Sequence, residues 1–342
     1  MEGWVEQTDA RKHVFEDLGI AAFLLEVWGE AYRSDGIVGE NEQEEEEEQK
    51  EGEKGTGIVS APQFPGFVDI GCGNGVLVYI LRQEGYRGWG FDARRRKTWD
   101  TLPPDVRENL KEMLLVPDIL NQNGSTSSHN LAGDGHKPAG GEEDTEGAAF
   151  HNGIFPPGTF IISNHADELT PWTPLLAHLN HSPFIAIPCC SHNLAGARYR
   201  FNNREPSTTT TNNAQPSNNS TSVAHFASAE NGPGPKSGSL ASPQTNAAKQ
   251  PSAYASLTAY VTSLATEVGY EVEKEVLRIP STRNIAIVGR RHRQGEGEGG
   301  DDKRKRDAVK KILEREVGSV KDVGREWVER AKKIAKGKVT GH

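Results

Sequence analysis

The chain has 342 residues, of which 35% are hydrophobic, and its mean hydropathy of −0.64 is low for that length, so we expect much of it to lie outside a folded core. Its net charge of −9 looks unfavourable for nucleic-acid binding, but residues 40–54 contain nine Glu and two Lys, which leaves a net charge of −2 on the remainder. No apolar run approaches the roughly 18 residues that span a bilayer, and three cysteines cannot build a secreted disulfide scaffold, which excludes both classes and predicts a soluble cytosolic or nuclear protein.

The first predicted element is an amphipathic helix over residues 9–33, within an N-terminal segment 1–39 that we expect to pack on the core. Its apolar side chains recur at three- and four-residue steps, a spacing that places them on one helix face. They are Val14, Leu18, Ala21, Ala22, Leu25 and Trp28. The acidic stretch that follows, 40–57, is predicted to be a disordered linker because it has almost no large apolar side chains to bury.

Strands and helices alternate through the rest of the chain. The predicted strands cover 66–71, 88–93, 112–120, 158–166, 183–190, 271–280 and 284–291, and the predicted helices cover 76–86, 169–180 and 255–271. This alternation predicts an α/β fold with a mostly parallel sheet covered on both faces, and the short connection between the last two strands predicts an antiparallel hairpin at the edge.

The domain organisation follows from these elements. We expect one folded domain over 58–293, interrupted by disordered insertions at 121–150 and 202–250, and then a basic helical segment over 294–342. Without the low-complexity stretches, a core of roughly 200 residues remains, which is the size of one domain.

Three glycines follow the first predicted strand and precede a helix, in the stretch FVDIGCGNG. Glycine allows the sharp turn and the close approach of a ligand, and a helix N-terminus offers free N–H groups. Asp92 ends the second predicted strand, 21 residues after Gly71, where a carboxylate can accept hydrogen bonds from both hydroxyls of a ribose. The spacing therefore predicts a site for a nucleoside cofactor.

The order of the glycines distinguishes between cofactors. A nicotinamide fingerprint needs glycine at position 76, where the chain has Val76, whereas the pattern D-x-G-x-G-x-G is present from Asp69 to Gly75. This pattern is similar to motif I of class I S-adenosylmethionine-dependent methyltransferases, which have a Rossmann-like seven-stranded sheet with an antiparallel last strand. The cofactor-binding residues that the resemblance implies are Asp69, Gly71, Cys72, Gly73, Asn74, Gly75, Asp92, Asp118 and Asn164.

Longer blocks carry a more specific resemblance. Residues 15–28, 67–100, 162–177 and 188–201 together resemble the eukaryotic tRNA uridine-44 2′-O-methyltransferases, also called tRNA (uracil-O(2)-)-methyltransferases. The resemblance implies methylation of the ribose 2′-hydroxyl of a uridine in cytoplasmic tRNA, a cytoplasmic location, and neither DNA nor a membrane as partner. The basic residues expected to meet the RNA are Arg94, Arg95, Arg96, Lys97, Arg198 and Arg200. Solvated surface charge is the alternative for any one of these clusters.

In this fold, the segment after the fourth strand lies beside the transferred methyl group, and here it reads SNHADELTPW. We expect Asp167 to position or deprotonate the hydroxyl, with His165 either assisting or packed behind it. Many ribose methyltransferases use a Lys-Asp-Lys-Glu set, for which Lys12 could be the first lysine. The last strand has no glutamate, so that set is incomplete, and His192, Arg198 and Arg200 are the nearest replacements.

The stretch PCCSH contains Cys189, Cys190 and His192, all possible zinc ligands. Adjacent cysteines lack the usual spacer of two to four residues, and no second cysteine pair completes a tetrahedron, so we expect no metal. Two other functions stay open: a class I methyltransferase acting on a protein or a small molecule, and a non-catalytic tRNA-binding subunit. The absence of NPPY and DPPY argues against the enzymes that methylate DNA or base amines.

Overall fold

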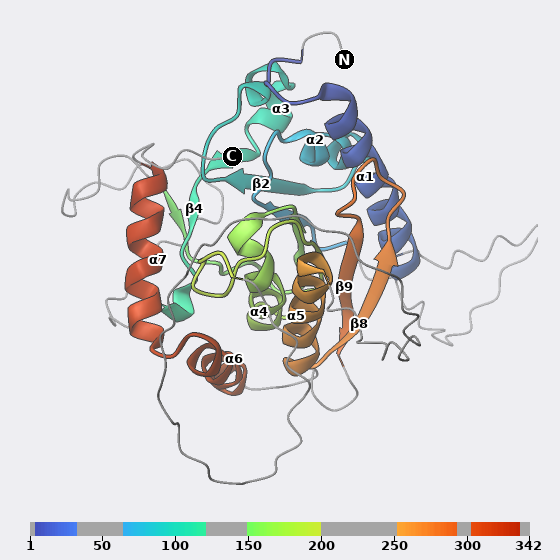
Figure 1. Cartoon of the computed structure of the whole chain (residues 1–342). Coiled ribbons are helices and arrows are strands. Elements are labelled where there is room, and N and C mark those ends of the chain that lie inside the picture. Colours follow the sequence, from blue (N-terminus) through green and yellow to red (C-terminus); the bar gives the residue numbers. More distant parts are fainter. Residues whose placement is uncertain (1–3, 33–63, 121–148, 200–251, 293–301, 336–342) are drawn as a thin grey trace, which may run out of the picture.

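A seven-stranded sheet runs through the centre of the computed structural model, which describes residues 4–32, 64–120, 149–199, 252–292 and 302–335 (Figure 1). Its strands are β1 (Phe67–Ile70), β2 (Gly88–Asp92), β3 (Leu110–Glu112), β6 (Phe160–Asn164), β7 (Phe184–Ile187), β8 (Tyr270–Val276) and β9 (Ile285–His292). They are arranged in the order β3-β2-β1-β6-β7-β9-β8. The first five strands in this order, β3, β2, β1, β6 and β7, pair in parallel. Strand β9 is antiparallel to both β7 and β8. The predicted fold class and the terminal antiparallel hairpin are confirmed.

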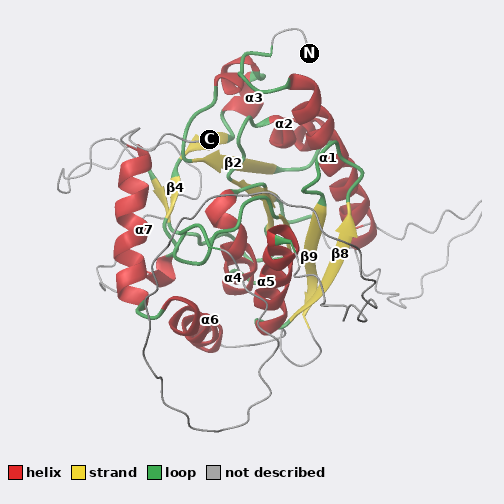
Figure 2. Ribbon diagram, viewed as in Figure 1, coloured by secondary structure: helices red, strands yellow, loops and turns green. Residues whose placement is uncertain are grey.

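Helices cover both faces of the sheet, as the ribbon colours show (Figure 2). The helices are α1 (Ala10–Tyr32), α2 (Val76–Gln83), α3 (Pro104–Arg107), α4 (Thr173–Leu179), α5 (Ala253–Glu267), α6 (Asp302–Val317) and α7 (Val320–Ala335). Three short 3₁₀ helices connect them: η1 (Lys97–Thr101), η2 (Asp118–Leu120) and η3 (Asp167–Trp172). Side chains of α1, α2 and α3 share one buried cluster with the sheet, and those of α4 to α7 share the other.

The strands read as continuous apolar runs because their two faces feed these two clusters. In β7, Phe184 and Ala186 belong to the cluster under α4, while Ile185 and Ile187 belong to the one under α1. All four side chains are fully buried. A strand that is covered on both sides gains burial from every residue, which explains why it shows no alternation with polar side chains.

The buried face of α1 differs from the predicted one. Trp28 packs between the rings of Phe67 and Phe160, as the periodicity suggested, but Leu18 is 44% exposed and Ala22 is also exposed. The buried side chains are Glu16, Asp17, Ile20, Ala21, Leu24, Val27 and Trp28. The prediction was wrong because it used apolar residues alone, whereas two acidic side chains lie on the face that meets the sheet.

The third strand was also misplaced. The edge strand is β3, at Leu110–Glu112, and the apolar pair after it forms β4 (Leu114–Leu115) in a separate two-stranded sheet with β5 (Phe150–His151). Because β5 is ordered, the insertion predicted over 121–150 ends before Phe150. Both Leu114 and Leu115 are buried, and Leu115 packs in the cluster that includes the C-terminal helices, which explains an apolar signal outside the main sheet.

The C-terminal segment is part of the core. The Trp327 indole of α7 donates a hydrogen bond to the carbonyl of Leu115 (2.7 Å), and its ring contacts Trp172 edge-on at 5.6 Å. Helix α6 buries Val309, Ile312 and Leu313 in the same cluster. Residues 302–335 therefore close one side of the domain instead of forming a separate appendage.

The predictions of disorder for 40–57 and 202–250 fall outside the described residues. Within the described residues, none of the helices combines the length and the apolar character that crossing a membrane requires.

Candidate active site

The order of the strands places the site. Chain order reverses between β1 and β6, because β2 and β3 lie on one side of this pair and β7, β9 and β8 on the other. Open α/β sheets bind ligands in the crevice outside the carboxyl ends of their strands at such a reversal. Here β1 runs into residues 71–75 and β6 runs into residues 165–167, so the two segments singled out from the sequence meet at this point.

The glycine loop adopts the conformation that requires glycine. Gly71, Gly73 and Gly75 have φ values of 78°, 51° and 77°, in the left-handed region. A β-carbon on Gly71 would lie 2.9 Å from that of Ala166, so this glycine lets the loop pass against the segment after β6. A β-carbon on Gly73 would meet nothing within 4 Å, so the loop faces open space there. The loop is therefore a cradle with room for a ligand.

Asp92 points at this loop. Its carboxylate accepts hydrogen bonds from the amides of Gly73 (3.0 Å) and Arg94 (3.1 Å), and Arg96 lies 3.6 Å away. The spacing of the two segments in the sequence predicted this proximity. The carboxylate thus lies beside the open side of the cradle, and its role as the ribose ligand stays a prediction.

Residues of η1 hold the loop from behind. The indole of Trp99 donates to the carbonyl of Gly73 (2.9 Å), and the hydroxyl of Thr98 donates to that of Asn74 (2.8 Å). The Asn74 side chain accepts from the amide of Val76 (2.8 Å) at the start of α2. Both η1 side chains are buried, so the loop is preorganised before any ligand arrives.

Two acidic side chains of α1 complete the site, and sequence reasoning missed both. Asp17 accepts hydrogen bonds from the amide groups of Asn74 (3.3 Å) and Asn164 (3.4 Å), so one carboxylate joins the glycine loop to the end of β6. Glu16 lies 3.0 Å from Nε2 of His165. The available signal was a pair of adjacent acidic residues shortly before the apolar stretch 20–25 of the helix.

The site concentrates buried carboxyl groups. Burial raises the pKa of Asp17 to about 7. Burial raises the pKa of Asp69 well above its usual range, and the nearby charges of Asp17 and Asp92 raise it further. Oδ1 of Asp69 and Oδ1 of Asn164 are buried and have no hydrogen-bond partner among the residues that the structure describes. Buried acceptors without partners are costly, so this arrangement fits a ligand that brings positive charge and N–H donors.

The segment after β6 is strained. His165 and Asp167 have φ values of 52° and 44°, a region that costs a non-glycine residue about 1–3 kcal/mol and is concentrated at functional sites.

Burial alone would raise the pKa of Glu16, but the hydrogen bond and the charge of His165 outweigh it and lower that pKa. The imidazole is thereby anchored to α1.

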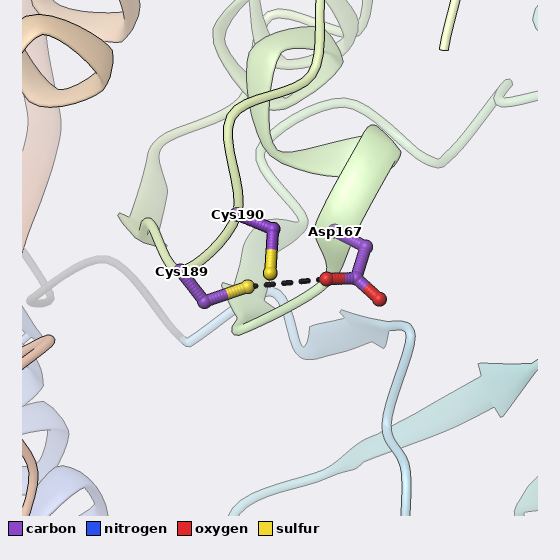
Figure 3. A group of neighbouring side chains, drawn as sticks. All are labelled: Asp167, Cys189 and Cys190. Atoms are coloured by element: carbon purple, nitrogen blue, oxygen red, sulfur yellow. Dashed lines mark hydrogen bonds between the residues drawn. The ribbon is translucent and has the colours of Figure 1, made fainter. Parts of the chain in front are cut away.

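Asp167 lies at the start of η3, next to two sulfur atoms (Figure 3). The thiol of Cys189 donates to Oδ1 of Asp167 at 3.3 Å, and Cys190 lies on the same side. The second carboxylate oxygen points away from both sulfurs (Figure 3). Asp167 therefore has one oxygen held by the thiol of Cys189, and its other oxygen is directed away from both sulfurs.

Two predicted site residues are not brought to this cluster. The side chain of Lys12 is exposed on the first turn of α1, while the buried acidic residues follow one turn later. Asp118 lies in η2, where its carboxylate pairs with Arg306 of α6 (2.9 Å) and its amide bonds the carbonyl of Asn152. Neither partner of Asp118 belongs to the glycine loop, so the geometry does not support its predicted contact with adenine.

The predicted RNA-binding residues lie in different surroundings. Arg95 pairs with Asp100 (2.5 Å) and lies over the ring of Trp99, and Arg96 lies against Asp92, so both support the loop. Within the described part of the chain, neither Arg94 nor Lys97 is paired with an acidic side chain. Arg198 is exposed after β7, and Arg200 lies outside the described residues.

Comparisons with known proteins agree with this geometry. A family model described as a predicted AdoMet-dependent methyltransferase matches residues 1–39 and 58–117, which carry α1, the glycine loop and Asp92. No solved structure matches the chain.

Curated relatives match most of the chain. It is 42% identical to the tRNA (uracil-O(2)-)-methyltransferase of Aspergillus oryzae, over 99% of this chain and 52% of the relative. Proteins of the same name from Neurospora crassa and Saccharomyces cerevisiae are 43% and 37% identical, over 86% and 84% of this chain and 44% of each relative. The chain spans about half the length of these relatives. It belongs to the family of S-adenosylmethionine-dependent methyltransferases in which the tRNA (uracil-O(2)-)-methyltransferases are found.

Proposed function

We propose that this protein transfers a methyl group from S-adenosylmethionine to the ribose 2′-hydroxyl of uridine 44 in tRNA, in the cytoplasm. One observation supports the proposal most strongly: the glycine loop, Asp92 and the buried carboxylate of Asp17 converge where the strand order reverses. The names of the relatives support tRNA as the substrate and an oxygen atom as the methyl acceptor. The ribose 2′-hydroxyl as the acceptor, the uridine position and the cytoplasmic location are supported by the motif resemblance alone.

The residues present fit the cofactor. S-Adenosylmethionine carries a sulfonium and an ammonium group. These positively charged groups complement the carboxyl groups of Asp17, Asp69 and Asp92. Asp92 is placed to bind the ribose, and the open side of Gly73 gives the backbone close access to the ligand. Asp17 and Asp69 are the acceptors for the ammonium group. When bound, the cofactor supplies an electrophilic methyl group on sulfur.

The protein's remaining tasks are to orient the hydroxyl and to remove its proton. Asp167 offers an oxygen that points away from the thiols, and the strained backbone of the segment fixes its direction (Figure 3). His165, held by Glu16, lies two residues away and can bind a neighbouring polar group of the substrate. In this arrangement Asp167 takes the proton of the 2′-hydroxyl, and a role for Lys12 stays a prediction.

The basic side chains near the loop supply the contact with RNA. Arg94 and Lys97 follow the end of β2 directly, so phosphates bound there would lie beside the cofactor cradle. RNA is held largely through its backbone, which makes such contacts sensitive to salt.

Replacing Asp92 tests the cofactor site. We expect Asp92→Ala to lower the affinity for S-adenosylmethionine at least 100-fold, because it removes the ribose acceptor and frees the amide of Gly73. Isothermal titration calorimetry measures this affinity. Asp105→Ala, which removes an exposed carboxylate on α3, should bind like the wild type. Normal affinity in the Asp92 variant would refute the assigned pocket.

The pH dependence of binding tests Asp17. Because its pKa is about 7 in the free protein and a bound ammonium group favours the charged form, lowering the pH must weaken binding. We expect the affinity to fall up to about tenfold from pH 7.5 to pH 6.0. Asp17→Asn should bind more weakly and lose most of this dependence. An unchanged slope in Asp17→Asn would contradict the assignment.

The reaction is tested by mapping ribose methylation on tRNA from a strain that lacks the enzyme. The wild-type protein should methylate uridine 44, and Asp167→Asn should keep cofactor affinity within about twofold while turnover falls at least 100-fold. A methylated base or another position would overturn the proposed specificity. Cofactor binding without methylation of any tRNA would favour a protein or small-molecule substrate, and failure to bind the cofactor would favour a non-catalytic subunit.

The RNA contact is tested by removing charge beside the loop. The double variant Arg94→Ala, Lys97→Ala should bind tRNA more weakly and lower the salt slope of log K by about 1 to 2, since two phosphate contacts disappear. The double variant Lys274→Ala, Arg278→Ala removes equal charge at and just after strand β8, at the opposite edge of the sheet, and should leave the slope unchanged. Equal effects of the two variants would mean that tRNA affinity depends on the net charge of the protein and not on phosphate contacts of Arg94 and Lys97.

A further inference from the structure

Two thiols and one carboxylate oxygen meet at the carboxyl ends of β6 and β7. Because these strands are parallel neighbours, in register at Asn164 and Ile187, the residues that follow them emerge side by side. Asp167 follows β6, and Cys189 and Cys190 follow β7. Their three potential ligand atoms all lie within 4.8 Å of one another, and all three side chains are half-buried. Figure 3 shows both sulfur atoms on the same side as one carboxylate oxygen.

This spacing is close to that of a tetrahedral zinc site. With Zn–S distances of about 2.3 Å and Zn–O distances of about 2.0 Å, a tetrahedral ion holds sulfur and oxygen about 3.5 Å apart. The sulfur of Cys189 lies 3.3 Å from Oδ1 of Asp167, so the pair needs little movement to bind one ion. The missing spacer between the adjacent cysteines argued against a metal in the sequence, but that argument did not include Asp167 as a ligand.

The donor chemistry indicates which ion would bind. Thiolates select soft or borderline ions, and a carboxylate oxygen disfavours Cu(I), which leaves Zn²⁺ as the best match. His192, in the loop that carries the cysteines, is 7% exposed, but it does not belong to the group of ligand atoms that lie within 4.8 Å of one another, so we do not count it as a ligand.

We propose that Asp167, Cys189 and Cys190 bind one Zn²⁺ ion, through Oδ1 and the two sulfur atoms. Binding replaces two thiol protons, which are released to solvent, so the three side chains and the ion keep the net charge of −1 that the carboxylate and two thiols have without it. Three protein ligands leave the fourth position to water. Metal binding itself does not depend on the proposed function, whereas its effect on turnover rests on that function.

The site gives Asp167 a fixed orientation. With Oδ1 on the ion, the other oxygen still points away from the sulfurs, toward the side on which we place the acceptor hydroxyl (Figure 3). The ion would thus be a positioning element for the carboxylate and would not touch the transferred methyl group.

The test uses the full chain, purified under reducing conditions, stripped with a chelator and titrated with Zn²⁺. We expect one zinc per chain by elemental analysis, and release of about two protons per ion in weakly buffered solution. Cobalt(II) in place of zinc should produce a sulfur-to-cobalt charge-transfer band in the near ultraviolet. These measurements on the wild-type protein need no variant to fold.

Variants locate the site. Cys189→Ser and Cys190→Ser should each lose most of the zinc and the cobalt band, while Cys72→Ala, which removes the other cysteine of the chain, should keep both. Asp167→Asn should weaken zinc binding at least tenfold while retaining sulfur-to-cobalt absorption at high cobalt concentration.

Two results would overturn the proposal: no stoichiometric zinc and no charge-transfer band in the wild type, or equal zinc in a folded Cys189→Ser, Cys190→Ser double variant. The first result would leave the three residues as a hydrogen-bonded thiol–carboxylate group. Calorimetry with S-adenosylmethionine on the same samples separates the two hypotheses. Zinc binding without cofactor binding would support the metal site and refute the proposed function. Cofactor binding without zinc binding would refute the metal site and support the proposed function.

Discussion

The site depends on one buried carboxylate that joins three segments far apart in the chain. Asp17 of α1 binds the side chains of Asn74 and Asn164, and so fastens the helix to the glycine loop and to the end of β6. A buried charge is tolerated only when it is hydrogen-bonded or neutralised, and the two amide donors satisfy this requirement in part. The helix is therefore both a cover for the sheet and a wall of the site.

Repulsion between the clustered carboxyl groups explains why the site fits a cationic cofactor. Asp69 and Asp92 lie within electrostatic reach of each other, and Asp17 adds to the repulsion on Asp69. In a low-dielectric site, this repulsion costs stability until a cation is bound. A sulfonium cofactor with an ammonium group relieves that cost, and it also satisfies acceptors that have no partner among the described residues of the free protein. The carboxyl groups whose repulsion lowers the stability of the free protein would therefore contribute to the affinity for the cofactor.

Local patterns in the sequence predicted part of this arrangement. The approach of Asp92 to Gly73 follows from one strand–helix–strand unit, whose geometry hardly varies, so chain spacing was sufficient. The acidic face of α1 was missed because periodicity arguments consider apolar residues, and Leu18, which they favoured, is exposed. The third strand was misplaced because the apolar Leu115 packs with Trp327 of α7, which lies about 200 residues later in the chain.

The sequence by itself determined the fold class, the glycine cradle and the position of Asp92, since each depends on interactions within a few tens of residues. Only the tertiary structure decided which face of α1 meets the sheet, and that Asp17 reaches Asn164. It also brought Cys189 to Asp167, because parallel pairing of β6 and β7 sets residues from different strands side by side. Contacts of this kind are set by the packing of whole elements, and no local spacing in the chain encodes them.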